Sequence, residues 1–217
     1  GETPSLTSVI EKESVVLAAS ATGIINKKER LITDTKLKAG DRIILIKSAG
    51  VNANGISLVR AIAKKLKDGY KTKLKNKKMF GEQVLNKTNI YAKLVEDLLD
   101  NKIEVHYISN ITGHGLRKIM RARNKFTYVV EKVFEPQEIF EFIKEKGNLA
   151  DSVMYETYNM GQDYAIFIPE KNVKKAQAII KKNRFQSIDA GYVETGPRQV
   201  IIKPKDIVFK GDTLDLR

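Results

Sequence analysis

The chain has 217 residues and no cysteine, and its 39 Lys and Arg against 26 Asp and Glu give a net charge of +13. This length allows one sizeable core, or one domain with a fragment of another. The composition excludes a disulfide framework and a thiol nucleophile, and no apolar run approaches the ~20 residues needed to cross a bilayer. Because no signal-peptide pattern opens the sequence, we expect a cytoplasmic protein.

Residues 1–36 are predicted to be the end of a preceding domain. The run from Ser14 to Ile25 is rich in small and β-branched residues, which is typical of a strand. A strand that is apolar on both faces needs neighbours in a sheet. We therefore expect it either to pair with a further part of the protein or to dock on a second copy.

Residues 37–217 are predicted to form a second domain in which strands and helices interleave. The expected strands are 42–47, 105–108, 126–133, 163–168, 188–194, 199–202 and 207–209, and the expected helices are 56–66, 89–100, 116–123, a helix that follows Pro136 and is capped by Gly147, and 173–182. The lysine-rich segment 64–78 has no clean apolar period and indicates an exposed, mobile loop. This order predicts an α+β fold with a largely antiparallel sheet backed by helices.

The segment from Ser48 to Arg60 is the most informative feature, because a glycine-bearing loop here joins an apolar strand to an amphipathic helix. Gly50 and Gly55 permit positive φ and close ligand approach, and Asn52 and Asn54 offer amide donors. A loop of this kind presents backbone N–H groups at a helix N-terminus, which suits an anion. The alternative is an ordinary turn that binds no ligand, in which the glycines are needed only for steric reasons.

Five groups of residues, in order along the chain, carry a resemblance to a known family. They are Gly1-Glu2-Thr3, Ser48 to Arg60, Leu85 with Thr88 to Lys93, Asn110 to Leu116, and Met154 to Gly161. Together they resemble the aminoimidazole ribonucleotide (AIR) synthetases, also called phosphoribosylformylglycinamidine cyclo-ligases. The resemblance spans nearly the whole chain. It implies that family's C-terminal domain, preceded by the last strand of its N-terminal domain, which contributes to a barrel across a homodimer interface.

The resemblance also implies a reaction. The formamide oxygen of formylglycinamidine ribonucleotide is phosphorylated by ATP with Mg²⁺, and the neighbouring nitrogen then attacks the activated carbon, expels phosphate and closes the imidazole ring. This chemistry needs charge neutralisation and positioning rather than a protein nucleophile. Because the family's nucleotide site draws on a part that this chain lacks, we expect the chain alone to be inactive.

Site residues follow from the matching motifs. His114 is the candidate catalytic residue, Glu2 the candidate metal ligand and Thr3 the candidate nucleotide-binding residue. The phosphorylated substrate is assigned to Asn52, Asn54, Gly55, Asn110, Thr112, Gly113, Gly115, Asn159 and Gly161. Arg117 or Lys118 could add positive charge beside the second turn. A turn-stabilising role for Asn54, a packing role for residues 159–161 and a solvated Glu2 remain open alternatives.

The chain departs from the family pattern at positions that matter for chemistry. Asn52 and Asn110 stand where the family has histidines, Ala53 replaces a serine, and His114 replaces the middle glycine of the second turn. Apart from His114 the chain has only His106, which lies in an apolar strand and is expected to be structural. These changes are compatible with a diverged relative that acts on another amide or phosphate substrate.

Two rival interpretations remain. Hydrogenase-maturation, thiamine-phosphate kinase and selenophosphate synthetase proteins share the architecture, but their loops match these motifs less well. The net charge also fits a non-catalytic basic module that binds nucleic acid or a protein partner. Retention of DNA or RNA at moderate salt would favour that module.

Overall fold

A computed structural model describes residues 20–214 of the chain. The chain divides into two units, Gly1–Leu31 and Ile32–Arg217. In the described part of the first unit, residues 20–25 form no strand and a single 3₁₀ turn covers Lys28–Arg30. The predicted strand 14–25 is therefore wrong over residues 20–25, and its residues 14–19 lie outside the described part. The domain boundary at residue 36 stays a prediction.

The second unit is built on a sheet of seven strands in the order β2-β4-β1-β5-β3-β6-β7. All neighbouring strands are antiparallel except β3 and β6. The strands are β1 (Arg42–Lys47), β2 (Tyr107–Asn110), β3 (Phe126–Val130), β4 (Gln162–Ile168), β5 (Ser187–Thr195), β6 (Gln199–Ile202) and β7 (Ile207–Lys210). The predicted α+β class with a largely antiparallel sheet is confirmed.

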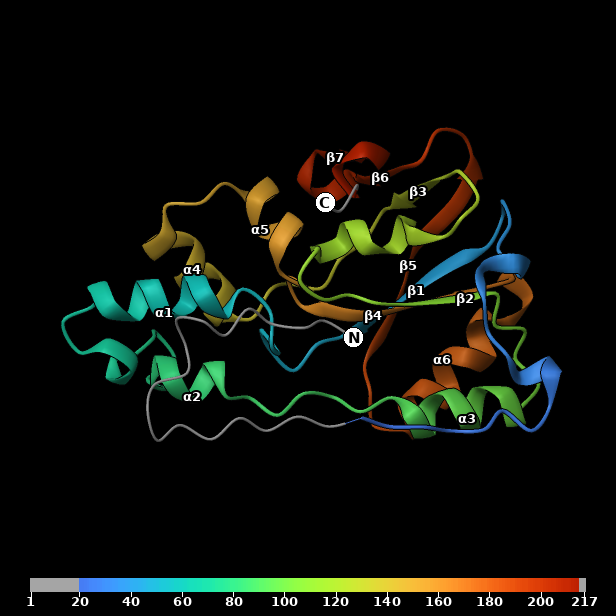
Figure 1. Ribbon diagram of the computed structural model, residues 1–217, viewed down its shortest axis with the longest axis horizontal. Coiled ribbons are helices and arrows are strands. Elements are labelled where there is room, and N and C mark those ends of the chain that lie inside the picture. Colours follow the sequence, from blue (N-terminus) through green and yellow to red (C-terminus); the bar gives the residue numbers. More distant parts are fainter. Residues whose placement is uncertain (1–19, 215–217) are drawn as a thin grey trace. The chain divides into compact units, whose positions relative to one another are not determined.

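Helices cover both faces of this sheet (Figure 1). One face carries α3 and α6, which pack on each other, and the other face carries η4 and the remaining α-helices. The α-helices are α1 (Ile56–Lys65), α2 (Phe80–Val84), α3 (Ala92–Asp100), α4 (Glu138–Gly147), α5 (Asp151–Thr157) and α6 (Val173–Lys182). The 3₁₀ turns of this unit are η2 (Asp34–Lys36), η3 (Gly69–Lys71), η4 (Gly115–Arg121), η5 (Glu170–Asn172), η6 (Lys203–Lys205) and η7 (Gly211–Leu214).

The central strand β1 is buried on both faces, which explains its uninterrupted apolar sequence. Ile43 and Leu45 belong to the core beneath α1 and α4, whereas Ile44 and Ile46 belong to the core beneath α3 and α6. Side chains alternate between the faces of a strand, so one short apolar run serves two cores.

The strand pairing brings three chain segments to one end of the sheet. The last residue of β1, Lys47, lies opposite Gln162 at the start of β4, after a register shift. The last residue of β2, Asn110, lies opposite Tyr164. The loop after β1, the turn after β2 and the turn before β4 therefore start from neighbouring positions.

Several local predictions are wrong. Part of segment 64–78, expected as a mobile loop, forms η3 and a hairpin in which Lys73 pairs with Met79. The segment after the second turn is the 3₁₀ helix η4 rather than an α-helix. Gly147 is the last residue of α4, and the left-handed cap is Asn148, with φ of 50°. The short helices α2 and α5 were not expected, because neither is long enough to show a helical period.

No helix within residues 20–214 combines the length and the apolar character needed to span a membrane.

Gly191 in β5 offers a test of the sheet. A methyl group added there would lie 1.9 Å from the carbonyl oxygen of Val129 on β3, so neither strand can accept it without moving. We predict that Gly191→Ala lowers the free energy of unfolding by about 3 kcal/mol or more, measured by urea denaturation. Gly23→Ala is the control, because its added methyl meets nothing within 4 Å. Equal stabilities for the two variants would contradict the observed strand packing.

Candidate functional site

The loop between β1 and α1 is held by side chains from other parts of the chain, which bind its carbonyl oxygens. Asn89 Nδ2 donates to Lys47 O (3.2 Å), Gln137 Nε2 to Ser48 O (2.6 Å), Asn86 Nδ2 to Ala49 O (3.2 Å), Asn159 Nδ2 to Gly50 O (2.7 Å) and the Tyr158 hydroxyl to Gly55 O (3.0 Å). A loop without regular structure is thereby fixed along most of its length.

Most N–H groups of the same loop have no hydrogen-bond acceptor among the described residues. Within the described residues, the N–H groups of residues 49–53 and 55–58 have no hydrogen-bond acceptor, whereas Asn54 N donates to Val51 O. The last four of these belong to Gly55 and to the first turn of α1, whose N–H groups cannot be satisfied within the helix. A run of unpaired donors at the positive end of a helix dipole attracts an anion.

Gly55 is the residue that lets the loop enter α1. It precedes the helix with φ of 63°, and an added methyl would lie 2.3 Å from the ring of Tyr158. Position 55 therefore requires glycine, because other residues rarely adopt this φ and because the Tyr158 ring leaves no room for a side chain. The predicted importance of Gly55 has a structural basis, and its role in binding a ligand stays a prediction.

A buried polar network lies at the base of the loop. Asn52, with φ of 54°, donates from Nδ2 to Asp163 Oδ2 (3.0 Å), and the Tyr91 hydroxyl donates to Asp163 Oδ1. Asn89 Nδ2 donates in turn to the Tyr91 hydroxyl (3.0 Å). Asp163 is buried, and burial raises the pKa of its carboxyl group; the pKa of Tyr91 is raised by burial and by the neighbouring carboxylate. Asn52 Oδ1 is buried without a partner among the described residues.

The second turn, residues 110–115, lies beside this loop. A methyl group added to Gly113 would be 3.8 Å from Asn54 Oδ1, and Ile111 N donates to Asp163 O (2.8 Å). Gly115, with φ of 54°, packs directly under the carbonyl of Tyr155. The predicted residues Asn54 and Gly113 therefore lie together rather than on opposite sides of the molecule.

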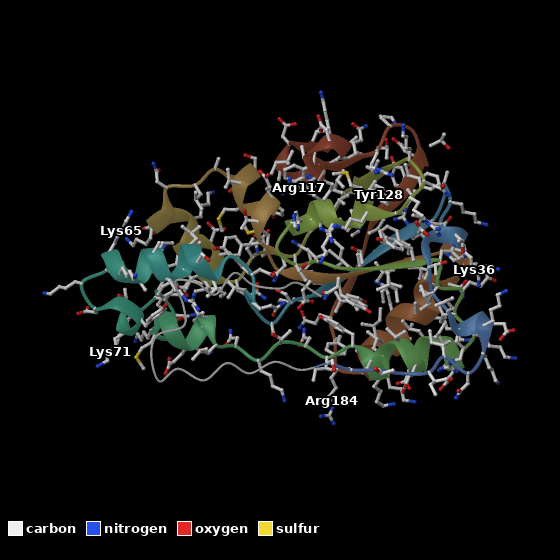
Figure 2. The ribbon with its side chains drawn as sticks, viewed as in Figure 1. Lys36, Lys65, Lys71, Arg117, Tyr128 and Arg184 are labelled. Carbon is white, nitrogen blue, oxygen red and sulfur yellow. The ribbon has the colours of Figure 1, made fainter. Side chains whose placement is uncertain are left out.

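Both basic residues considered for this turn contact it: Lys118 Nζ donates to Thr112 Oγ1, and Arg117 Nε donates to His114 O (3.4 Å). Arg117 is buried next to α5 (Figure 2), where it pairs with Glu156 (3.0 Å) and donates to Thr213 O (2.6 Å). Burial lowers the pKa of Arg117. These contacts give Arg117 a packing role beside the turn, and the suggestion that it adds charge there stays a prediction.

His114 lies in the second turn with its ring beside η4. Arg121 Nη2 lies 3.2 Å from His114 Nδ1. Since a guanidinium has only donors, Nδ1 accepts, and the proton of the neutral ring sits on Nε2. The contact with Arg121 fixes the orientation of the His114 ring.

The turn at residues 159–161 supports the loop from below. Asn159 is fully buried, its Oδ1 accepts from Gly161 N (3.0 Å), and Ser48 N donates to Gly161 O (2.9 Å). Both ends of the Asn159 amide are therefore bound to backbone groups. The structure favours the packing alternative for this turn over direct ligand contact.

The remaining predicted residues have diverse surroundings. Asn110 is exposed at the end of β2, adjacent to the site. Glu2 and Thr3 lie outside the described residues. His106 is buried with Nδ1 2.8 Å from Asp41 Oδ2, so the expected structural role fits its surroundings. Among residues 20–214 no group of three His, Asp or Glu could hold a metal ion.

Asp163, Tyr91 and the amides of Asn86, Asn89 and Gln137 were not predicted as site residues, although Asn89 and Tyr91 lie in the matching motif Thr88 to Lys93. Asp163 did carry a signal, because a carboxylate at the start of the apolar strand Tyr164–Ile168 has to find buried partners. Asn86, Asn89 and Gln137 lie in polar connections, where one more amide is unremarkable. Their contacts with the loop join residues 37 to 89 positions apart, which no local pattern shows.

The described residues form an α+β domain with one candidate anion-binding site, and comparison with known proteins agrees with this fold class. The family described as AIR synthase related protein, C-terminal domain, matches residues 38–203, and the chain belongs to this family. It is 36% identical over 212 residues to the phosphoribosylformylglycinamidine cyclo-ligase of Methanosarcina barkeri, covering 97% of this chain and 59% of that protein. For the enzyme of the same name from Methanocaldococcus jannaschii the identity is 35%, covering 84% and 52%.

The chain therefore spans little more than half the length of these relatives. Among solved structures, the hydrogenase maturation protein HypE of E. coli superposes with a TM-score of 0.55 at 14% identity, over 86% of this chain and 53% of that one. A HypE–HypF complex gives a TM-score of 0.51 at 15% identity, over 78% and 51%. At this identity the likeness supports the fold alone.

The Asp163 network predicts a pH dependence. Its folded-state pKa lies above the ordinary 3.8, so the stabilisation linked to the protonated carboxyl is complete below about pH 4 and is lost as pH rises through the folded pKa. Asp163→Asn stays neutral, and its amide can donate to Asn52 Oδ1 after a flip of Asn52. We predict that this variant gains stability relative to the natural chain as pH rises, measured by urea denaturation at several pH values.

Asp163→Ala is the matched control, because it leaves both Asn52 and Tyr91 without their partner. We expect it to cost about 2–4 kcal/mol at neutral pH. A constant stability difference between the natural chain and Asp163→Asn across this range would show that the carboxyl group does not titrate with a raised pKa.

Proposed function

We propose that this chain is the substrate-binding portion of an ATP-dependent cyclo-ligase that closes formylglycinamidine ribonucleotide to aminoimidazole ribonucleotide. The observation that carries the proposal is the loop at residues 48–55. Side chains bind the carbonyls of Ser48, Ala49, Gly50 and Gly55, while the N–H groups of residues 49–53 and 55 have no acceptor among the described residues. The unpaired N–H groups of such a loop can donate hydrogen bonds to the phosphate of a ribonucleotide. The family membership and the names of the relatives support this choice of substrate.

The loop after β1 and the second turn at residues 110–115 contribute different groups to ligand binding. The loop at residues 49–58 offers backbone donors to the ribonucleotide phosphate, and the side chain of Asn54 adds an amide next to Gly113. Lys118, held on Thr112, places a positive charge on the second turn. Fixed donors of this kind need no reorganisation when charge develops, which is the main requirement for stabilising a phosphorylated intermediate.

Ring closure joins two groups of one molecule, so positioning supplies much of the rate. In the proposed reaction the phosphoryl group of ATP passes to the formamide oxygen, the neighbouring nitrogen attacks the formyl carbon, and the C–O bond breaks as inorganic phosphate leaves. A proton is lost from the attacking nitrogen. His114, the candidate catalytic residue, is oriented by Arg121 and would donate a hydrogen bond to an oxygen of the leaving phosphate.

ATP and Mg²⁺ are assigned to Glu2, Thr3 and the part of the full enzyme that this chain does not cover. The described residues do not fit a metal, since no cluster of three His, Asp or Glu occurs among them. Homodimer formation and a cytoplasmic location belong to the same proposal and follow from the resemblance.

The alternative function is the non-catalytic module. It is favoured by the net charge and by the loss of both family histidines at positions 52 and 110. In this chain four side-chain amides bind successive carbonyls of one loop. A module that binds no small molecule would not need a loop fixed in this way. The preorganised loop therefore favours the enzyme.

Calorimetric titration of the chain with formylglycinamidine ribonucleotide tests the proposal. We predict that the natural chain binds this ligand and that Lys118→Ala lowers the affinity by at least about tenfold. The reason is that a hydrogen bond from a charged group contributes about 1.5–3 kcal/mol. Lys174→Ala on α6, an exposed lysine on the opposite face of the sheet, is the control and should bind like the natural chain.

Ribose 5-phosphate serves as a second ligand, which separates phosphate recognition from recognition of the amidine. The proposed site would be rejected if the natural chain bound neither ligand. It would also be rejected if the Lys118 and Lys174 variants lost affinity equally.

A further inference from the structure

One end of the described molecule is strongly basic. Exposed lysines and one arginine follow one another from the second half of α1 through η3 and the hairpin, and this segment contains a single acidic residue, Asp68. We name it the basic end; its cations are Arg60, Lys64, Lys65, Lys67, Lys71, Lys73, Lys75, Lys77 and Lys78. Figure 2 shows Lys65 and Lys71 at this end of the molecule, with their side chains directed away from the sheet.

The basic end is an ordered structure. Phe80 N donates to Thr72 O (2.8 Å), Leu74 N donates to Lys78 O (2.9 Å), and the buried side chain of Leu74 anchors the hairpin. The lysines are consequently held at fixed positions on a folded turn. Holding like charges together is unfavourable unless something of opposite charge is nearby.

Acidic side chains lie near part of the basic end, because Glu138, Glu141 and Glu145 of α4 line one hollow together with Lys73 and Lys75. Within the described residues none of the nine cations forms an ion pair. Glu138 on α4 accepts instead from Asn76 N (3.0 Å), and Glu145 pairs with Lys146 (2.7 Å). The C-terminal dipole of α1 accounts for Lys64 and Lys65. It does not account for the hairpin lysines, which lie beyond the helix.

An exposed aromatic ring adds a second, independent feature. Tyr70 stacks on Phe80, with centroids 6.0 Å apart and planes 20° from parallel, and 45% of Tyr70 remains exposed. Gly81 makes this packing possible, because an added methyl would lie 3.1 Å from Tyr70 Cβ. One side of the ring is thus fixed against the protein while the residue stays open to solvent.

The ring and the cations meet in one hollow. It has a volume of about 420 Å³ and is lined by Arg60, Ala63, Lys64, Gly69 and Tyr70. A flat aromatic wall beside two cations matches a nucleotide unit, whose base stacks while its phosphate is neutralised.

We infer that the basic end binds single-stranded nucleic acid, with a base stacked on Tyr70 and the backbone running over the hairpin lysines. An acidic peptide would use the charge and leave the ring without a role, and a duplex keeps its bases inside the helix. This binding surface is separate from the loop at residues 48–55, so it holds or fails independently of the proposed ligase function.

The test measures fluorescence anisotropy of a labelled twelve-nucleotide oligouridine with the 217-residue chain at two salt concentrations. The test variant carries Lys71→Gln, Lys73→Gln and Lys78→Gln. The control carries Lys174→Gln, Lys181→Gln and Lys182→Gln on or at the end of α6, which are also exposed and also remove three positive charges. Circular dichroism checks that each variant is folded.

We expect the test variant to bind at least about tenfold more weakly, with the slope of log affinity against log salt reduced by about 2, since each neutralised phosphate contributes about 0.7 for single strands. The control should change affinity less than about threefold. Tyr70→Ala should weaken binding about tenfold with an unchanged salt slope, because it removes stacking alone.

Equal weakening by the two triple variants would overturn the proposal, since it would show a response to net charge rather than to this surface. Tighter binding of a duplex of the same length, equal competition by polyglutamate, or full affinity in Tyr70→Ala would also overturn it. Tyr70→Phe keeps the stacking face and should restore the affinity that Tyr70→Ala loses.

Discussion

The structure of the site depends on the binding of main-chain carbonyls by side-chain amides at residues 47–50. Asn89, Gln137, Asn86 and Asn159 come from three separate parts of the chain and bind four successive carbonyls. Each amide hydrogen bond is modest by itself, but four of them together fix which way the peptide groups of the loop face. The N–H groups of residues 49–53 are left unpaired among the described residues in that arrangement, and the first turn of α1 adds the N–H groups that no helix can satisfy internally.

Asn52 stands where the resemblance implies a histidine, and it takes part in the buried network at the base of the loop. Asn52 binds a buried carboxyl group, that of Asp163, which is also bound by Tyr91. Burial raises the pKa of this carboxyl group, and the hydrogen bonds from Asn52 and Tyr91 satisfy both of its oxygens. Asn52 and Asp163 are therefore best understood as one unit, and the lost histidine does not by itself imply a lost site.

Much of the fold could be predicted because its signals are local. The apolar run at Arg42–Lys47 and the helical period of Val173–Lys182 gave the bounds that the structure shows. The turn before α1 was also predictable, because Gly55 occupies a conformation that other residues rarely adopt. The amide contacts were not predictable, since Gln137 and Ser48 meet only after the sheet has formed. The hairpin after Lys73 was missed for a related reason, because its anchor is the single residue Leu74.

Helix α1 connects the two positively charged features of the molecule. Its first turn contributes unpaired N–H groups to the loop, and its last turn contributes Lys64 and Lys65 to the basic end. Leu58, the last residue of this run of unpaired N–H groups, lies about 10 Å along the helix axis from Lys64 and Lys65 at a rise of about 1.5 Å per residue, and Arg60 is only two residues away. These separations are close to or below the Debye length of about 8 Å at physiological salt, so charge at the basic end also acts on a phosphate held in the loop. The same charge can raise the rate at which anionic ligands arrive, while the hydrogen bonds that hold them come from the loop.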